Sequence, residues 1–393
     1  DVGGNWYYGS CHSSVYGSTH LISSKRLTEY VDFAMPGDYP EYPHHSQALA
    51  YLRAYAQTFG LYSRIQFHTS VERIERVPEG FVVSAADGSR ALYRGVVIAN
   101  GHHSEPRWPN YPGEFTGTTV HAHHYKVPDI LRDRRVLVVG AGNSGCDIAV
   151  ESALHARSTH LSLRRGYYFV PKFLCGKPVD RLQETLVQLR LPPWLHRLVA
   201  ERLVHLAVGS PEAYGLPRPD HHLFETHPIV NTLLPHFAGH GRIHVKPDVA
   251  RFDGQCVHFQ DGSSAEIDVV ILATGYRIHF PFLDPRLLNT EGECPRLFLN
   301  VFSPVDDRIF VAGLIQPDGG LWRLADLQSK LIARFLRADE SRSASANWFR
   351  RLKRHAGNSH PTRNYVASTR HLIEVDYFDY RRRIECLLAE FER

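Results

Sequence analysis

The chain has 393 residues, 43% hydrophobic and 22% charged, a globular composition long enough for two or three domains. Its 45 Lys and Arg residues nearly balance 41 Asp and Glu residues, and no long basic run predicts a nucleic-acid partner. The six cysteines form no Cys-x-x-Cys pair, which argues against zinc ribbons and redox dithiols and indicates a reducing, cytoplasmic location. Apolar runs fall far short of the ~18–20 residues that cross a membrane, so no membrane partner is predicted.

Short β-branched runs alternate with helical stretches along the chain, a pattern typical of a parallel α/β sheet. Apolar residues spaced three or four apart predict helices over 46–59 and 326–336, and an amphipathic helix packed on the body over 194–209. Pro-rich clusters between these elements indicate loops. The four predicted strands of the sheet are 81–85, 95–99, 135–139 and 268–273.

The sharpest motif directly follows the strand at 135–139 and reads GAGNSGCD, a Gly-x-Gly-x-x-Gly turn before a helical stretch. Gly140 permits the tight turn, Gly142 lets the backbone approach a pyrophosphate, and Gly145 lets helix and strand pack closely. The unpaired N–H groups at the start of the helix bind the anion. The motif predicts a dinucleotide site that comprises Gly140, Gly142, Asn143, Ser144, Gly145, Cys146 and Asp147.

The end of the next predicted strand, 159–163, bears on which dinucleotide binds. An acidic residue there would bind a ribose 2′-hydroxyl, whereas an arginine would bind a 2′-phosphate. The strand is followed by Arg164 and Arg165, and no carboxylate is present. The sequence therefore favours NADPH over NADH, with Arg164 or Arg165 on the 2′-phosphate. The alternative is that both arginines belong to a solvated strand end.

Several separated motifs resemble those of the flavin-containing monooxygenase family, of the dimethylaniline monooxygenase type, over nearly the whole chain. FTGTTVHAHHY at 115–125 is similar to the signature before the family's NADPH-binding strand. DVVILATGY at 268–276 resembles the segment that returns to the FAD domain. GGNW at 3–6 resembles a flavin-bordering motif. Further family segments are similar to residues 16–25, 32–36, 39–40, 51–52, 313–317 and 326–328. The resemblance implies cofactor contacts at Gly3, Gly4, Asn5, Trp6, Leu21, Ile22, Ser23, Thr274, Gly275 and Gln316.

The resemblance also implies a fold and a domain organisation. The expected fold is α/β with two Rossmann-like dinucleotide-binding domains, the NADPH domain being inserted into a discontinuous FAD domain. We expect the first part of the FAD domain at 1–128, the NADPH domain at 129–272, and the FAD return segment with C-terminal helices at 273–393. The segment 171–226 is expected to form part of the substrate entrance.

The activity implied by the resemblance is oxygenation of a nitrogen or sulfur atom in a small organic nucleophile. In this family NADPH reduces FAD, and the reduced flavin reacts with O2 to form a C4a-hydroperoxyflavin shielded from water. Because the flavin carries the chemistry, no catalytic side chain is assigned. The expected partners are the small-molecule substrate and O2, and a homodimer is one expected assembly.

Two departures from the family pattern bear on these expectations. The chain begins at Asp1, and its single methionine is Met35. The Gly-x-Gly-x-x-Gly unit that binds FAD in the family would lie before the Gly-Gly-x-Trp motif, so we expect an N-terminally truncated chain that holds FAD weakly. Counting from Tyr16 places Ile22 where the family usually has an asparagine that contacts flavin and NADP⁺. Isoleucine cannot donate a hydrogen bond, so peroxide leakage is expected unless a neighbour such as Ser23 or His20 provides the missing donor.

Two alternative functions remain open from the sequence. The first is a Baeyer–Villiger ketone monooxygenase, against which Tyr125-Lys126 argues modestly because ketone-oxidising relatives usually carry a tryptophan there. The second is a non-catalytic NADPH-binding remnant that cannot retain FAD. The 25 histidines do not follow the spacing of zinc ligands, so no metal site is predicted. Trp322 is expected either to shape the substrate entrance or to pack in the core.

Overall fold

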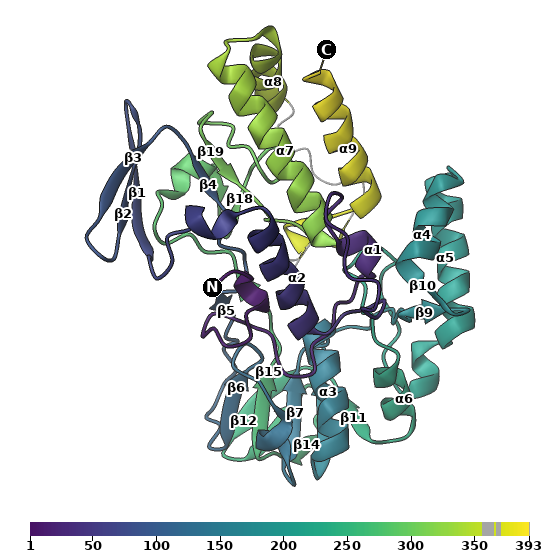
Figure 1. Cartoon of the computed structure of the whole chain (residues 1–393). Helices are drawn as coiled ribbons and strands as arrows, with labels where there is room; N and C mark the ends of the chain where they lie inside the picture. The colour runs from purple at the N-terminus through teal and green to yellow at the C-terminus, as the bar shows by residue number, and fades with distance from the viewer. Residues whose placement is uncertain (356–364, 367–370, 393) are drawn as a thin grey trace.

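Figure 1 shows a computed structural model of the chain, which describes residues 1–355, 365–366 and 371–392. Its lower part is built on a five-stranded, fully parallel sheet with the order β11-β8-β7-β15-β6. Crossover connections of this kind require long segments between neighbouring strands, and these carry helices and a second small sheet. The strands are β6 (Thr118–His121), β7 (Arg135–Val139), β8 (Ser158–Ser162), β11 (Ile243–Lys246) and β15 (Val269–Leu272).

The parallel sheet is covered on both faces, because successive residues of a strand point to opposite sides. Val136 and Val138 of β7 pack in the core that includes helix α3 (Asn143–His155). Leu137 and Val139 pack on the other face against an antiparallel sheet. That sheet consists of β12 (Val249–Asp253), β13 (Cys256–Phe259) and β14 (Ser264–Glu266).

The upper part of the molecule combines segments from both ends of the chain (Figure 1). Strand β4 (Val96–Ile98) pairs in parallel with β19 (Ile309–Val311), two hundred residues later. Phe302, fully buried, contacts the rings of Phe310, Phe335 and Phe349. The surrounding elements are α2 (His45–Thr58), α7 (Leu321–Glu340), α8 (Ala344–His355), α9 (Tyr377–Glu390) and the antiparallel sheet of β1 (Val71–Val77), β2 (Gly80–Ala85) and β3 (Arg90–Tyr93).

Short elements connect these two parts. The pairs β5–β16, β9–β10, β17–β18 and β20–β21 are each two residues long on either side. Their bounds, with the remaining helices, are α1 (Lys25–Thr28), α4 (Val179–Gln188), α5 (Pro193–Val208), α6 (Leu233–Gly239), β5 (Glu105–Pro106), β9 (Phe173–Leu174), β10 (Lys177–Pro178), β16 (Tyr276–Arg277), β17 (Thr290–Glu291), β18 (Cys294–Pro295), β20 (Gln316–Pro317) and β21 (Glu374–Val375). Short 3₁₀ turns lie at Gly4–Trp6, Leu61–Arg64, Pro128–Leu131, Pro211–Tyr214 and Pro285–Leu288.

The predicted elements are largely confirmed, with three differences. The strand at 81–85 forms as β2, but its antiparallel partners β1 and β3 show that the expectation of a parallel strand was wrong. Helix α7 runs well beyond the predicted 326–336 at both ends, because its apolar stripe continues.

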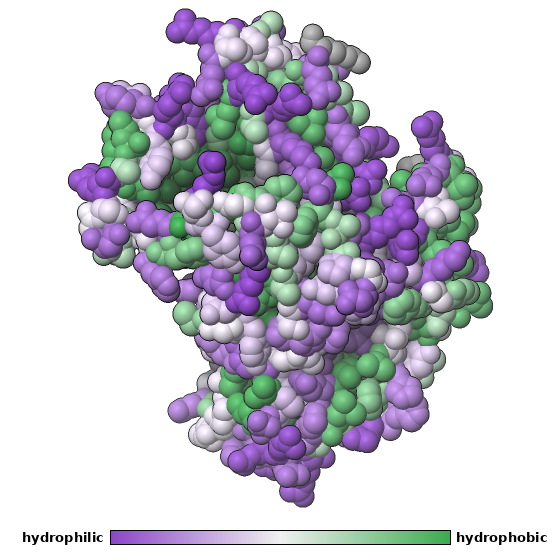
Figure 2. Space-filling view, in the orientation of Figure 1, coloured by the Kyte–Doolittle hydropathy of each residue, from purple (hydrophilic) through white to green (hydrophobic). Residues whose placement is uncertain are grey.

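The third difference concerns the helix predicted at 194–209. It forms as α5, but it pairs with α4 and projects beside the body rather than lying flat on it (Figure 1). Its apolar residues Trp194, Leu198 and Leu206 are exposed. Figure 2 shows hydrophobic side chains gathered over this helix pair. In the part of the chain that the structure describes, no helix is both long and apolar enough to span a bilayer.

Histidine rings gather around Tyr276, where residues 101–125 meet the end of the parallel sheet. The Tyr276 ring lies 4.8 Å from the His103 ring, 5.5 Å from His121 and 5.8 Å from His123, measured between centroids. His121 and His123 are 1% and 3% exposed. Desolvation lowers the pKa of His121 and of His103 to about 4, because burial penalises the charged imidazolium.

This histidine cluster should make the fold sensitive to mild acid. The unfolded chain binds protons on His103 and His121 near pH 6.5, whereas the folded chain binds them only near pH 4. Stability should therefore fall as pH decreases from about 6.5 to about 4. Urea denaturation at several pH values should show a shallower fall for His121→Asn, while the exposed-site control His12→Gln should follow the wild type. Equal slopes for all three proteins would contradict this account.

Candidate functional site

The glycine turn after β7 requires glycine because backbone atoms of another strand approach it closely. Gly140 has φ 103°, and a Cβ atom there would lie 2.5 Å from the carbonyl oxygen of Ala273, just after β15. A Cβ atom on Gly145 would collide with the carbonyl oxygen of Gly140. Two neighbouring strand ends, the turn and the start of α3 are thus packed backbone to backbone. This leaves the carboxyl edge of the sheet free of side chains at the turn.

The start of helix α3 is suited to binding an anion. Its N-cap residue Gly142 provides no side-chain hydrogen bond to the helix, and Ser144 in the first turn is exposed. The first N–H groups of an α-helix have no intrahelical acceptor, and the helix dipole favours negative charge there. Helix starts of this kind commonly bind the pyrophosphate of a dinucleotide.

Two polar residues of the predicted motif, in contrast, make hydrogen bonds to other parts of the protein. The Asn143 amide donates to the Pro228 carbonyl at 3.2 Å and accepts from the Val230 N–H at 2.8 Å. Asp147 accepts hydrogen bonds from Tyr16 at 2.9 Å and Asn231 at 2.7 Å. Asn143 and Asp147 therefore hold Tyr16 and the segment 228–231 against the glycine turn. Cys146 is fully buried beneath it.

The two arginines at the end of β8 differ in their surroundings. Arg165 forms an ion pair with Asp220, with 3.7 Å between its Nε and the carboxylate, so it is less available to a phosphate. Arg164 is exposed at the same edge of the sheet as the glycine turn. A phosphate group near this edge would meet Arg164 first.

Thr274 and Gly275 lie next to the glycine turn, since they follow Ala273. The Thr274 hydroxyl donates to the Arg107 carbonyl at 2.6 Å, and the Gly275 carbonyl accepts from the Arg107 N–H at 2.9 Å. Gly275 has φ 81°, a conformation that favours glycine. The structure thus brings Thr274, Gly275 and the predicted dinucleotide motif together.

The N-terminal residues predicted to border a flavin form a separate group from the glycine turn. Gly3 and Gly4 have positive φ angles, Asn5 accepts from the Ser14 N–H at 2.8 Å, and Trp6 meets Trp322 edge to face at 5.8 Å. Trp322 itself is 8% exposed and stacks on Tyr51, which favours the core role over the entrance role. Gln316 lies in β20, where it pairs with Glu374 of β21.

Tyr125 and Lys126 connect the N-terminal residues to helix α3. Lys126 donates from its ammonium group to the carbonyls of Ser13 at 2.5 Å and Val15 at 2.9 Å, and Tyr125 donates to Glu151 of α3. Leu21 is buried, and the Ser23 hydroxyl lies 2.7 Å from that of Thr28. Hydrogen bonds from Tyr125 and Lys126 therefore link the predicted flavin-bordering segment to the predicted dinucleotide motif.

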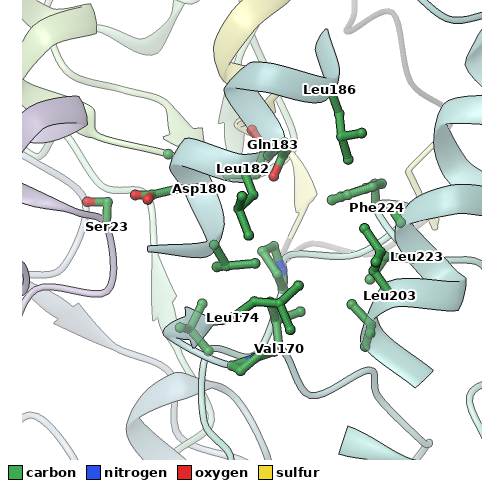
Figure 3. Close-up of a pocket in the computed structure, with 18 of the residues that line it drawn as sticks. Ser23, Val170, Leu174, Asp180, Leu182, Gln183, Leu186, Leu203, Leu223 and Phe224 are labelled. Carbon is green, nitrogen blue, oxygen red and sulfur yellow. The ribbon is translucent and has the colours of Figure 1, made fainter. Parts of the chain in front are cut away.

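A large cavity opens beside Ile22 and Ser23, with an empty volume of about 900 Å³ including its part open to solvent. Leucine and phenylalanine side chains from α4, α5 and the following loop point toward one another across it (Figure 3). Among the described residues that line it there is no lysine or arginine. Its apolar walls include Val170, Leu174, Leu182, Leu186, Leu203, Val204, Leu223 and Phe224.

Polar groups are concentrated at few points of the cavity wall. Asp180, at the start of α4, points its carboxylate toward Ser23 (Figure 3) and accepts from the Ser24 N–H at 2.6 Å. Burial raises the pKa of the Asp180 carboxyl. His227 lines the cavity as well, and its Nδ1 lies 3.1 Å from Oε2 of the buried Glu374. No group of three or more potential metal ligands occurs among residues 1–355, 365–366 and 371–392.

The sequence did not single out Asp180, His227 or Glu374. The segment 171–226 was expected to form a substrate entrance, and most of the cavity wall does come from it. His227 lies one residue beyond that segment and Glu374 lies in the C-terminal region. No local pattern in the sequence indicates their pairing, because 147 residues separate them.

Comparisons with known proteins identify the family. The model of the Flavin-binding monooxygenase-like family (FMO-like) matches residues 1–390. Flavin-containing monooxygenase 5 of Rattus norvegicus is 31% identical over 416 residues, which cover 99% of this chain and 76% of the rat protein. Flavin-containing monooxygenase 2 of Homo sapiens is 33% identical, covering 85% of this chain and 66% of the human protein.

Solved structures show the same fold. The open crystal structure of cyclohexanone monooxygenase matches with a TM-score of 0.71 at 16% identity, covering all of this chain and 91% of that one. S-allyl-L-cysteine S-oxygenase from Allium sativum matches with a TM-score of 0.64 at 20% identity, covering 99% and 80%. The predicted α/β fold with two Rossmann-like domains is thereby confirmed at the level of the class. The chain belongs to the flavin-binding monooxygenase family, and it is accordingly a flavoprotein oxidoreductase.

Proposed function

We propose that the protein uses FAD, NADPH and O2 to oxygenate a nitrogen or sulfur atom of a small apolar molecule. The cavity beside Ile22 and Ser23 carries this proposal, because it places an apolar binding space against a segment predicted to contact both cofactors. When bound, the flavin supplies the electrons and the activated oxygen. The protein binds the substrate and excludes water from it.

The residues present fit NADPH and the ring system of the flavin. The uncapped start of α3 and the side-chain-free turn at Gly140 and Gly142 suit the pyrophosphate of NADPH. Buried ring nitrogens of His45, His121 and His123 have no hydrogen-bond partner among the described residues, and a flavin with its carbonyl and N–H groups could satisfy them. Gly140, Gly142 and Ser144 would then hold NADPH, and residues 3–6 would border the flavin.

The chemistry of the cavity supports a neutral, soft nucleophile as substrate. Its walls are aliphatic, and apolar surface binds apolar surface at about 25 cal/mol per Å² removed from water. A thioether or an uncharged amine gains from such a site, whereas a carboxylate would lose its hydration without meeting a cation.

Oxygen consumption provides the direct test of the proposed function. The protein, supplied with FAD and NADPH, should consume O2 in step with formation of a sulfoxide from methyl octyl sulfide or an N-oxide from a tertiary amine. A cyclic ketone tested in parallel should give little lactone. Lactone formation alone would support the Baeyer–Villiger alternative, and a colourless protein without oxygen consumption would contradict the proposal.

Arg164→Ala should weaken the binding of NADPH selectively. A hydrogen bond to a charged group contributes about 1.5–3 kcal/mol, so the KM for NADPH should rise about 10–100-fold while that for NADH stays unchanged. Arg165→Ala is the matched control, since Arg165 already pairs with Asp220. Fluorescence titration of NADPH measures the same affinity without turnover. Equal losses for both nucleotides would contradict the assignment of Arg164 to the 2′-phosphate.

Ile22→Asn should reduce the release of hydrogen peroxide. Ile22 is 37% exposed and lines the cavity, so an asparagine there would face the reacting groups and donate a hydrogen bond that isoleucine cannot. The fraction of NADPH oxidised to peroxide should fall severalfold relative to the wild type. Ile22→Leu, which adds no donor, should leave that fraction unchanged. If both variants behave alike, Ile22 does not control peroxide release.

A further inference from the structure

His227 lines the cavity and pairs one of its ring nitrogens with a buried carboxylate. Its Nδ1 lies 3.1 Å from Oε2 of Glu374, and the two side chains are 8% and 1% exposed. Among the described residues, no group hydrogen-bonds Nε2 on the opposite side of the ring. A carboxylate on Nδ1 fixes the orientation of the imidazole and holds the Nδ1 hydrogen on the Glu374 side, which leaves the lone pair on Nε2. Nε2 is therefore able to accept a proton from a molecule in the cavity.

The segment that carries His227 is fixed on both sides. Just before it, His221 lies 2.9 Å from both the Asp220 carboxylate and the Thr226 hydroxyl, which closes the turn at 220–226. Just after it, the side chain of Asn143 from the glycine motif holds Pro228 and Val230. The ring is thus positioned in advance rather than by the substrate.

Glu374 connects the same ring to the part of the chain predicted to contact the flavin. Its strand β21 pairs with β20, where Gln316 is the direct partner of Glu374 and Pro317 lines the cavity. His227 therefore shares the cavity with Pro317 and with Ile22 and Ser23, two residues predicted to contact the cofactors.

An aliphatic amine presents a chemical problem to this cavity. Near neutral pH such an amine is protonated, as the pKa of about 10.4 for a lysine side chain illustrates. An ammonium ion has no lone pair with which to accept oxygen, and its charge is costly within apolar walls. An amine can therefore react only after it has lost its proton.

We propose that His227 is the base that removes this proton, with Glu374 as its positioning residue. The inference rests on the proposed function. The N–H bond of the ammonium breaks, its electron pair stays on nitrogen, and the proton forms a bond to Nε2 of His227. The oxygenation of a neutral amine by NADPH and O2 consumes one proton and releases water. The proton taken up by His227 is the one that the overall reaction requires, so the balance closes without a further reactant.

Asp180 is the competing candidate. It also lines the cavity, as do His196 and Asp318, and burial raises the pKa of its carboxyl. One of its oxygens, however, accepts from the Ser24 N–H, and the carboxylate points toward Ser23 rather than toward the converging apolar side chains (Figure 3). Asp180→Asn keeps an oxygen for Ser24 and removes the charge, which makes it the matched comparison.

Three substrates that differ in whether they carry a proton at pH 7.5 distinguish the deprotonation step from the other steps of the reaction. N,N-dimethyloctylamine is protonated at pH 7.5, N,N-dimethylaniline is not, and methyl octyl sulfide cannot be. For the FAD-loaded His227→Gln variant, kcat/KM for the octylamine should fall about 10²-fold, as expected for the loss of a general base. The values for the aniline and the sulfide should stay within about twofold, and they also show that the variant is folded.

Glu374 gives an independent readout through the pH profile. For the wild type, kcat/KM for the octylamine should decline toward acid, and Glu374→Gln should alter this decline while the aniline and sulfide profiles stay unchanged. Glu374→Asp should restore part of the wild-type profile. A merely structural role of Glu374 would reduce the rates for all three substrates without moving the decline.

The outcomes that overturn the inference are distinct from failure of the proposed function. Equal losses for all three substrates in His227→Gln would assign His227 a structural role. A loss specific to the octylamine in Asp180→Asn, but not in His227→Gln, would make Asp180 the base. If the wild type oxygenates none of the three substrates, the proposed function itself is wrong and the inference fails with it.

Discussion

The close approach of Gly140 to Ala273 is the constraint on which the site depends. Both residues follow buried strands, β7 and β15, that lie side by side in the parallel sheet. The chain turns tightly at Gly140, so that α3 starts directly above the sheet. Only glycine allows this turn, because a Cβ atom at this position would collide with the Ala273 carbonyl oxygen. The uncapped start of α3, Arg164 at the end of β8, and Thr274 with Gly275 all lie at this edge as a consequence. In open α/β sheets, ligands bind at such carboxyl edges.

The polar side chains around the turn connect this edge to the rest of the molecule. Asn143 holds the segment that carries His227, and Asp147 holds Tyr16. Through them the glycine motif positions one wall of the cavity and the segment leading to Ile22. Beside the cofactor binding proposed for it, the motif therefore also fixes the geometry of the cavity wall.

Local sequence patterns predicted the centre of this arrangement well. The run Arg135–Val139 is buried on both faces and followed by the glycine turn, so its bounds agree with β7 to the residue. Strand 81–85 was found but its parallel pairing was wrong, because a short run with one buried face reads the same in either kind of sheet. The cavity was located only as the segment 171–226. Its pairing of His227 with Glu374 depends on the approach of β21 to β20, which no local pattern encodes.

Isotope labelling tests the central claim, that the protein transfers one atom of molecular oxygen to its substrate, most directly. The protein supplied with FAD, NADPH and methyl octyl sulfide under ¹⁸O₂ should yield sulfoxide that carries one labelled oxygen, as measured by mass spectrometry. The same reaction in labelled water should yield unlabelled sulfoxide. Label from water, or NADPH oxidation that yields only peroxide and no sulfoxide, would contradict the account.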